Sequence, residues 1–428
     1  GIILPGLIPL AKPLYSLLYN QLFSHFLLYS VLTLAGCLLL LILPSTCMGA
    51  TLPVLCRFYI VQLGHLGTRS GRLYALNTIG AAVGSFVCGF WLIAWFGVWG
   101  SLLAAVFINC SIGAICFLAS ARLAQPLPLR HLPSSDTAAD AKPDADETTF
   151  PSSSAGHRFI TLSIFALSGF CAMAYEVIWT RLLGLIVGPT IYSFTIILTT
   201  FITGLGLGSL IFGRLADRTE KPLRLLIHTQ LFAAVLALGV SQLLGNSQLF
   251  FAKLIYHYQT TFGLLSAVKV FVLFIGMIGP TIFLGATFPL VGKIYTSSLG
   301  RIGHSIGFAY TVNTIGAVLG SFCAGFLLIP LAGKERSLSL VVGLQLCGAL
   351  CAGGYLVRAR RKAEFGKWVP AGVIALAALI LCVYLPHWNR QQLAVGMYHR
   401  FEEFSAELQS CGWLEALLHG PSRLEQHQ

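Results

Sequence analysis

Long apolar stretches separated by short polar ones dominate the chain. Each has about 20 residues, enough for a helix rising 1.5 Å per residue to cross ~30 Å of hydrocarbon. We count ten, at roughly 22–44, 72–95, 99–120, 159–178, 189–212, 223–244, 267–289, 305–330, 338–357 and 368–385. Residues 1–20 hold three prolines and a lysine among short apolar pieces, so we expect a span's end followed by an interfacial segment. The pattern predicts an all-α polytopic membrane protein.

The pattern also repeats along the chain. PSTCMGATLPVLCRFY, from Pro44, matches PTIFLGATFPLVGKIY, from Pro280, and GRLYALNTIGA, from Gly71, matches GFAYTVNTIGA, from Gly307. The offset is 236 residues throughout, with 24 identities in the 54 positions from Pro44 to Gly97. Three spans lie between the linker and the second GAT-x-P block, and that block's span and two more complete a six-span unit. An even number of crossings preserves orientation, which predicts two parallel six-helix repeats.

The first repeat is incomplete, because counterparts of residues 159–236 would fall before residue 1. Either the chain is an N-terminally incomplete version of a twelve-span protein, which the absence of an initiating Met favours, or the first bundle is a natural half. A segment with five prolines and five acidic residues separates the repeats and predicts a flexible linker. The expected domains are 1–121 (second half of the first repeat), 122–158 (linker), 159–362 (second repeat), 363–386 (an additional span) and 387–428 (a tail).

Composition agrees with a membrane protein. Hydrophobic residues make up 56% and charged residues 10%, and the mean hydropathy is +0.80. Of the 27 Lys and Arg residues, 18 fall on one set of alternating loops, and cytoplasmic loops carry such an excess. We therefore expect a cytoplasmic linker and an extracytoplasmic tail. The Lys and Arg residues of the cytoplasmic loops then account for the net charge of +12, and we expect no nucleic-acid partner.

The twelve cysteines include no CxxC pair and no Cys/His cluster of metal-ligand spacing. We expect them to be small packing residues, and we expect no metal or other cofactor.

Several segments together carry a family resemblance: AYEVIWTRLL, SFTIILTTFITGLGLGSLIFGRLADR, GATLP and GATFP, and the two NTIGA blocks. From about residue 20 to 390, the chain resembles the membrane portion of bacterial fused proteins in which a major-facilitator-like domain precedes a spermidine-synthase-like domain. The resemblance implies a major-facilitator-like bundle in the bacterial inner membrane, with a transporter or transporter-derived role and a polyamine or another cation as substrate. GRLADR also resembles a major-facilitator loop motif, which implies that Arg214, Asp217 and Arg218 form a cytoplasmic salt-bridge cluster, a candidate gate.

The tail from Pro386 resembles the segment that leads into the synthase-like domain. Aminopropyl transfer needs a proton acceptor, acidic residues for the polyamine and a glycine-rich acidic loop for the nucleoside cosubstrate. The chain has no Asp after Asp217 and no glycine-rich loop in its last 42 residues, so we do not expect these residues to catalyse it. Two alternatives to transport stay open. One is a membrane anchor or structural subunit that docks a synthase-like domain or complex, and the other is an aminopropyltransferase whose catalytic domain lies outside this chain.

Among the candidate site residues, Glu176 has the strongest support from the sequence. A charge in a span is unfavourable by ~3 kcal/mol on insertion scales, so such residues usually face the bundle interior. We expect Glu176 to bind a cationic substrate or carry a coupling proton, or alternatively to form a structural ion pair. Arg181 lies about 140° around the helix from Glu176, so the geometry for an ion pair within the helix is poor. Lys269, on another span, is an equal candidate for the partner of Glu176.

Asn77 and Asn313 occupy equivalent repeat positions inside spans. They could line a central site, or their amides could form hydrogen bonds that hold neighbouring helices together. The small-residue ladders that follow, from Gly80 and from Gly316, and the run Gly204–Gly208 predict close helix packing. The Pro and Gly residues of the GAT-x-P steps predict kinked or broken helices.

Overall fold

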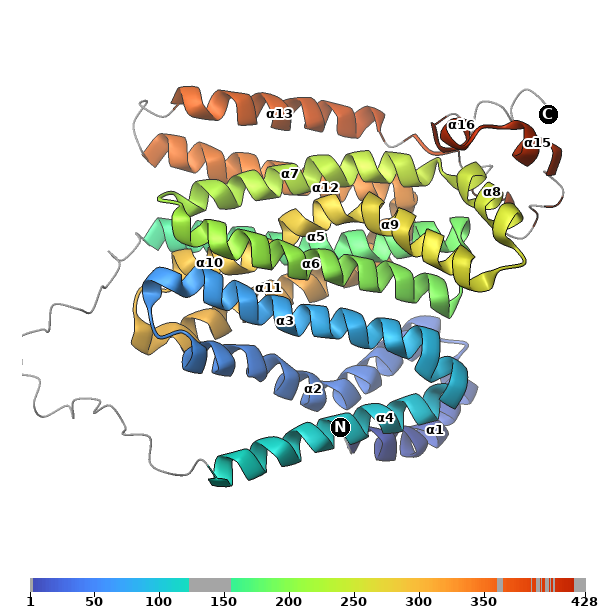
Figure 1. Ribbon diagram of the computed structural model, residues 1–428, viewed down its shortest axis with the longest axis horizontal. Helices are drawn as coiled ribbons and strands as arrows, with labels where there is room; N and C mark the ends of the chain where they lie inside the picture. The colour runs from blue at the N-terminus through green and yellow to red at the C-terminus, as the bar shows by residue number, and fades with distance from the viewer. Residues whose placement is uncertain are drawn as a thin grey trace, which may run out of the picture. The chain divides into compact units, whose positions relative to one another are not determined.

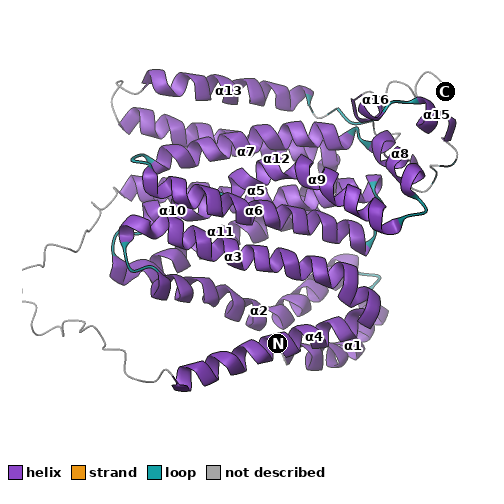
Figure 2. Ribbon diagram, in the orientation of Figure 1, coloured by secondary structure: helices purple, strands orange, loops and turns teal. Residues whose placement is uncertain are grey.

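The computed structural model describes residues 3–122, 155–359, 365–385, 387–389, 393, 395–396, 400, 402 and 405–418. The regular elements of these residues are all helical, as Figure 2 shows. In chain order (Figure 1) they are α1 (Ile3–Leu22), α2 (Phe26–Tyr59), η1 (Leu63–His65), α3 (Leu66–Val87), η2 (Cys88–Leu92), α4 (Ile93–Arg122), α5 (Ala155–Ile186), α6 (Ile191–Arg218), α7 (Pro222–Gly245), α8 (Gln248–Tyr258), α9 (Phe262–Gly285), α10 (Thr287–Tyr295), η3 (Leu299–Arg301), α11 (Ile302–Phe322), η4 (Cys323–Leu328), α12 (Ile329–Ala359), α13 (Phe365–Tyr384), α15 (Ser405–Ser410) and α16 (Trp413–Leu418).

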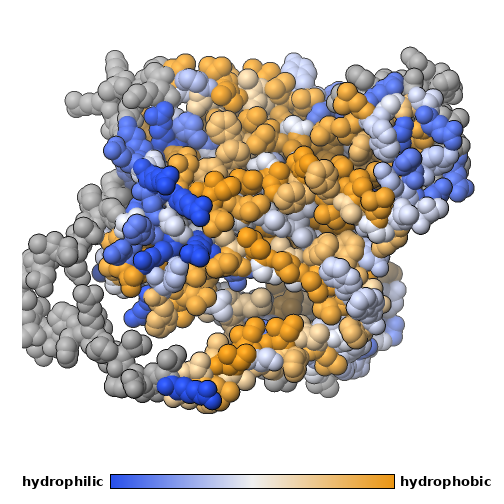
Figure 3. Space-filling model, viewed as in Figure 1, coloured by the Kyte–Doolittle hydropathy of each residue, from blue (hydrophilic) through white to orange (hydrophobic). Residues whose placement is uncertain are grey.

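Seven helical segments of the described residues are long and apolar enough to cross a membrane: Leu27–Tyr59, Leu63–Arg122, Ala155–Ile186, Ile191–Arg218, Pro222–Gly245, Phe262–Tyr295 and Leu299–Arg358. Trp368–Tyr384 is a shorter apolar helix. On the face drawn in Figure 3, apolar residues form a broad band along α6 and α7, and hydrophilic residues gather beyond its ends. The chain is therefore a multi-pass membrane protein.

Two of the seven segments are 60 residues long, far more than one crossing needs. Each contains one glycine at which the backbone leaves helical geometry, Gly97 (φ 65°, ψ −175°) and Gly333 (φ 77°, ψ 166°). Glycine adopts these positive φ angles without the clash that a Cβ would cause. The ten predicted spans lie mainly on helices, with residues such as 23–25 and 189–190 outside them, and their number remains a prediction.

The same order of local conformations occurs twice, 236 residues apart. The short 3₁₀ helix η1 corresponds to η3, and the π-helical turn η2 corresponds to η4 within one residue. Gly97 and Gly333 differ by the same offset. The repeated sequence therefore has a repeated local backbone conformation.

The chain forms two compact units, Gly1–Leu52 with Cys88–Thr149, and Pro53–Val87 with Phe150–Gln428. The first unit holds α1, most of α2, and α4. Here α1 is one helix that continues through Pro9 and Pro13, where the sequence predicted separate pieces. The Tyr29 hydroxyl donates a 2.6 Å hydrogen bond to the Tyr15 hydroxyl, which joins α2 to α1. The predicted linker falls almost wholly on residues 123–154, outside the described residues.

The second unit holds α3 and all helices from α5 onward, and glycines set its closest helix contacts. A methyl group placed on Gly316 or Gly320 of α11 would lie 2.1 Å from a carbonyl oxygen of α5. One placed on Gly208 of α6 would lie 2.0 Å from the Ile282 carbonyl oxygen of α9. These glycines pack helices as predicted. Gly80 and Gly84 of α3 differ, because no atom of another described segment lies within 4 Å of such a methyl group.

Candidate functional site

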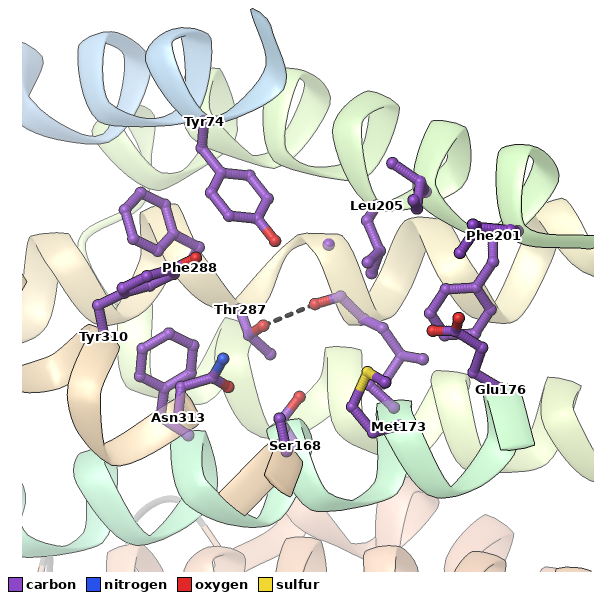
Figure 4. A pocket seen from close by; sticks show the side chains of 18 residues that line it. Tyr74, Ser168, Met173, Glu176, Phe201, Leu205, Thr287, Phe288, Tyr310 and Asn313 are labelled. Atoms are coloured by element: carbon purple, nitrogen blue, oxygen red, sulfur yellow. Dashed lines mark hydrogen bonds between the residues drawn. The ribbon is translucent and has the colours of Figure 1, made fainter. Parts of the chain in front are cut away.

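A cavity of about 350 Å³ lies inside the second unit, between α3, α5, α6, α11 and the junction of α9 with α10. Aliphatic side chains form much of its wall, and Figure 4 shows the residues around it. Its polar side chains are Tyr74, Ser168, Glu176, Thr287, Tyr310 and Asn313, and its phenylalanines are Phe165, Phe201 and Phe288.

Glu176 lies at one end of the cavity, beside Phe201 (Figure 4). The 32-residue helix α5 positions it, with Tyr175 and Trp179 on the neighbouring buried face. Its carboxylate makes no ion pair or hydrogen bond with any residue that the structure describes. Arg181 is exposed, Lys269 is partly buried, and neither lines the cavity. The structural ion pair that the sequence left open is therefore not formed with either residue.

Asn313 also lines the cavity, and a glycine makes room for it. A methyl group on Gly169 of α5 would lie 2.4 Å from the Asn313 carbonyl oxygen and 2.7 Å from its side-chain oxygen. Asn77, its counterpart in α3, is exposed and does not line the cavity. The structure therefore brings together Glu176 and Asn313 of the five predicted residues, and not Asn77, Arg181 or Lys269.

Aromatic side chains form the other end of the cavity. The Tyr74 ring stacks on Phe288 with centroids 4.6 Å apart, and Tyr310 meets Phe288 edge-on at 6.1 Å. Tyr74 and Tyr310 occupy equivalent positions of the repeat. Sequence analysis missed both, although identity at the 236-residue offset, together with a polar tip inside a span, could have identified them.

The cavity wall includes the junction of α9 with α10. α9 ends at Gly285 and α10 begins at Thr287, but Ala286 between them keeps helical angles (φ −64°, ψ −24°), so the second GAT-x-P step is a local irregularity, while the first lies inside continuous α2. The Thr287 hydroxyl donates a 2.6 Å hydrogen bond to the Leu284 carbonyl oxygen at this junction (Figure 4). Gly285 and Thr287 both line the cavity.

Asp217 has different partners from those predicted. Its carboxylate accepts hydrogen bonds from the backbone N–H groups of Gly67 (2.9 Å) and Thr68 (2.7 Å), at the start of α3, and lies 3.4 Å from Lys293 Nζ of α10. Lys293 also donates to the carbonyl oxygens of Leu63 and Gly64.

The side chains of Arg214 and Arg218 are exposed, and neither forms an ion pair with Asp217. The predicted cluster is therefore wrong in its partners. An acidic group is favourable at the start of a helix because free N–H groups point toward it, so Asp217 joins α6 to α3.

The chemistry of the cavity suits an organic cation. A carboxylate attracts a positive charge, and aromatic faces and aliphatic side chains accommodate an apolar body. The described residues contain no group of three or more His, Cys, Asp and Glu side chains arranged to hold a metal ion.

Comparison with known proteins gives one significant similarity. The chain is 26% identical, over 245 residues, to polyamine aminopropyltransferase 1 of Streptomyces coelicolor. The match covers 57% of this chain and 41% of the relative, so the chain matches less than half of the length of that protein. No protein-family model and no solved structure matches. The similarity supports a relationship to the spermidine-synthase-like proteins, as the resemblance predicted.

Proposed function

We propose that this chain is a transporter-like membrane domain, built from two parallel major-facilitator-like repeats, that admits a small organic cation to the cavity beside Glu176. The repeated sequence and the local conformations repeated at the same offset support this architecture. The charge pattern of the loops favours a cytoplasmic linker and an extracytoplasmic tail, and the family resemblance implies the bacterial inner membrane. The similarity to a polyamine aminopropyltransferase supports amines as candidate cations.

One observation carries this proposal: Glu176 is a carboxylate without a partner among the described residues, and it faces a cavity rather than lipid. An ionisable group in a membrane span is costly unless it is paired or faces an interior path. A purely structural glutamate would have an ion-pair or hydrogen-bond partner. A cationic ligand would supply the missing partner when it occupies the cavity.

Calorimetric titration of the purified chain in lipid nanodiscs with phenethylamine, n-hexylamine and spermidine tests this proposal. We expect saturable binding of at least one amine, weakened at least tenfold in Glu176→Gln. Glu220→Gln is the matched control, because Glu220 is exposed outside the spans, and we expect it to bind like the unmodified chain. Equal binding by all three proteins, or no binding of any amine, would sink the proposal.

Transport itself requires a second measurement. The chain reconstituted in proteoliposomes should take up the amine that binds most tightly, and the Glu176→Gln variant should not. Binding without uptake would favour a transporter-derived domain that has lost transport.

A second candidate function, a membrane anchor for an attached domain, is favoured by the tail. Trp388 Nε1 donates a 3.1 Å hydrogen bond to the Ser241 carbonyl oxygen, and the His387 backbone N–H donates to Gln242 Oε1 at 2.7 Å, both on α7. Leu408, Cys411 and Ala416 pack against α8. A segment fixed in this way could hold a following domain close to the membrane.

The anchor candidate predicts that a fluorescent protein fused after residue 428 is held rigidly. Its fluorescence anisotropy should fall when Trp388→Ala and Cys411→Asp loosen the tail, while amine binding stays unchanged. Unchanged anisotropy would argue against anchoring.

A further inference from the structure

The charges around the cavity discriminate between classes of amine, and this inference rests on the proposed function. Glu176 is the one formally charged side chain among the described residues that line the cavity. The other polar lining groups are hydroxyls and one amide. We propose that the site takes an organic monocation, with a single ammonium group on an apolar or aromatic body, in preference to a diamine or polyamine.

The geometry separates the charge from the other polar end. Asn313 packs against Gly169, and Glu176 lies seven residues further along α5, about 10 Å along the helix axis. A ligand whose ammonium contacts Glu176 therefore has its opposite end among Asn313, Tyr74 and Tyr310. In Figure 4 these three residues lie at the end of the cavity away from Glu176.

The neutral groups at the Asn313 end do not offset the desolvation cost of a second ammonium group. Hydroxyl and amide oxygens can accept hydrogen bonds, but a desolvated cation also needs an opposite charge nearby. The Tyr74–Phe288 stack takes up one face of each ring and Tyr310 meets Phe288 edge-on, so the three rings contact one another rather than standing apart as a cage. Ring faces that contact each other are not free to enclose a cation.

An apolar or aromatic body fits the middle of the cavity. Met173 and Leu205 line it there (Figure 4), and a thioether and aliphatic carbons make favourable contacts with ring or alkyl groups. An alkylammonium or arylalkylammonium ion satisfies both ends, since its charge meets Glu176 and its body replaces water against these side chains.

Matched ligands test this inference, since n-hexylamine and 1,6-diaminohexane share one carbon chain and differ by one ammonium group. In calorimetric titration of the chain in nanodiscs, we expect n-hexylamine to bind at least tenfold more tightly than the diamine. Diamine or spermidine binding as tight as that of n-hexylamine, lost in Glu176→Gln, would overturn the inference and leave the proposed function standing. Absence of Glu176-dependent binding for all these amines would overturn both.

A second variant adds the missing charge. Asn313→Asp places a carboxylate at the far end without a large change in volume, and we expect it to raise the affinity for 1,6-diaminohexane relative to n-hexylamine at least tenfold. Asn77→Asp, at the equivalent but exposed position, is the matched control and should leave the ratio unchanged. An unchanged ratio in a folded Asn313→Asp protein, with its thermal transition intact, would also contradict the inference.

Discussion

The two copies of the repeated segment, in α3 and α11, carry the same tyrosine, asparagine and glycine but use them differently. Tyr74 and Tyr310 both line the cavity, whereas Asn313 lines it and Asn77 is exposed. Gly316 lies against α5, while the described residues place no other segment against its counterpart in α3. Identical residues thus take the same local conformation, and the neighbouring helix decides what each side chain contacts. Equivalent substitutions in the two copies should therefore have unequal effects.

We expect the largest difference in the free energy of unfolding between the equivalent variants Lys293→Met and Arg57→Met. Lys293 contacts Asp217, and both side chains are about one-tenth exposed (11% and 10%), whereas the equivalent Arg57 is exposed. Removing Lys293 leaves Asp217 with only its two backbone N–H partners among the described residues, and breaking a nearly buried ion pair destabilises by up to ~3–5 kcal/mol. We expect that loss for Lys293→Met and less than ~1 kcal/mol for Arg57→Met, measured by denaturant titration in mixed micelles. Equal losses would show that Asp217 does not depend on Lys293.

A smaller difference is expected for Gly316→Ala against Gly80→Ala. The new methyl group would lie 2.1 Å from the Ala166 carbonyl oxygen in the first variant and would meet no other described segment in the second. Overpacking of this kind destabilises by ~1–3 kcal/mol, while alanine in an open helix stabilises by up to ~1 kcal/mol. The thermal transitions should therefore shift in opposite directions. A loss of stability in Gly80→Ala would reveal a neighbour of α3 that the described contacts lack.

Asn313→Ala against Asn77→Ala compares the two copies through ligand binding. Asn313 offers hydrogen-bonding groups to the cavity and Asn77 does not. Losing one hydrogen bond to a ligand removes ~1 kcal/mol, or about fivefold in affinity. We expect a reduction of that size in amine affinity for Asn313→Ala only, measured by calorimetric titration with an amine that carries a distal hydroxyl group, such as tyramine. Parallel reductions in both variants would indicate a general effect on the bundle.

We expect the smallest difference in amine affinity at the tyrosines, because both copies place this residue in the cavity wall. Tyr74→Phe and Tyr310→Phe each remove one hydroxyl from the cavity and keep the ring contacts with Phe288. Each should change affinity for n-hexylamine by less than about threefold, since an alkyl body makes no hydrogen bond there. A tenfold loss in either variant would place the ammonium group at the tyrosine end, away from Glu176.

The sequence predicted features that depend on residues close together in the chain, such as helices and small-residue packing faces. It did not predict contacts between residues far apart in the chain. Apolar stretches predicted the helices, and the Gly316 ladder and Gly208 predicted close packing, because a helix presents residues three or four apart on one face. Glu176 and Asn313 were identified because polar groups in hydrocarbon are costly.

The Lys293 partner of Asp217 was missed because it lies 76 residues away and depends on how α6 and α10 approach α3. Tyr74, Phe288 and Tyr310 were missed because aromatic residues in an apolar span resemble ordinary packing residues. Their shared cavity becomes visible only when several helices are placed together.

The close approach of α3 and α6 has a mechanical consequence. A methyl group on Gly71 would lie 2.6 Å from the Ser209 carbonyl oxygen, and one on Gly213 would lie 2.7 Å from that of Gly67. Side chains also hold this contact, because the Ser209 hydroxyl donates a 3.2 Å hydrogen bond to the Gly71 carbonyl oxygen and Asp217 accepts hydrogen bonds from the Gly67 and Thr68 N–H groups. We therefore expect α3 and α6 to move as one rigid pair in any rearrangement that exposes the cavity, while other helices of its wall separate from them.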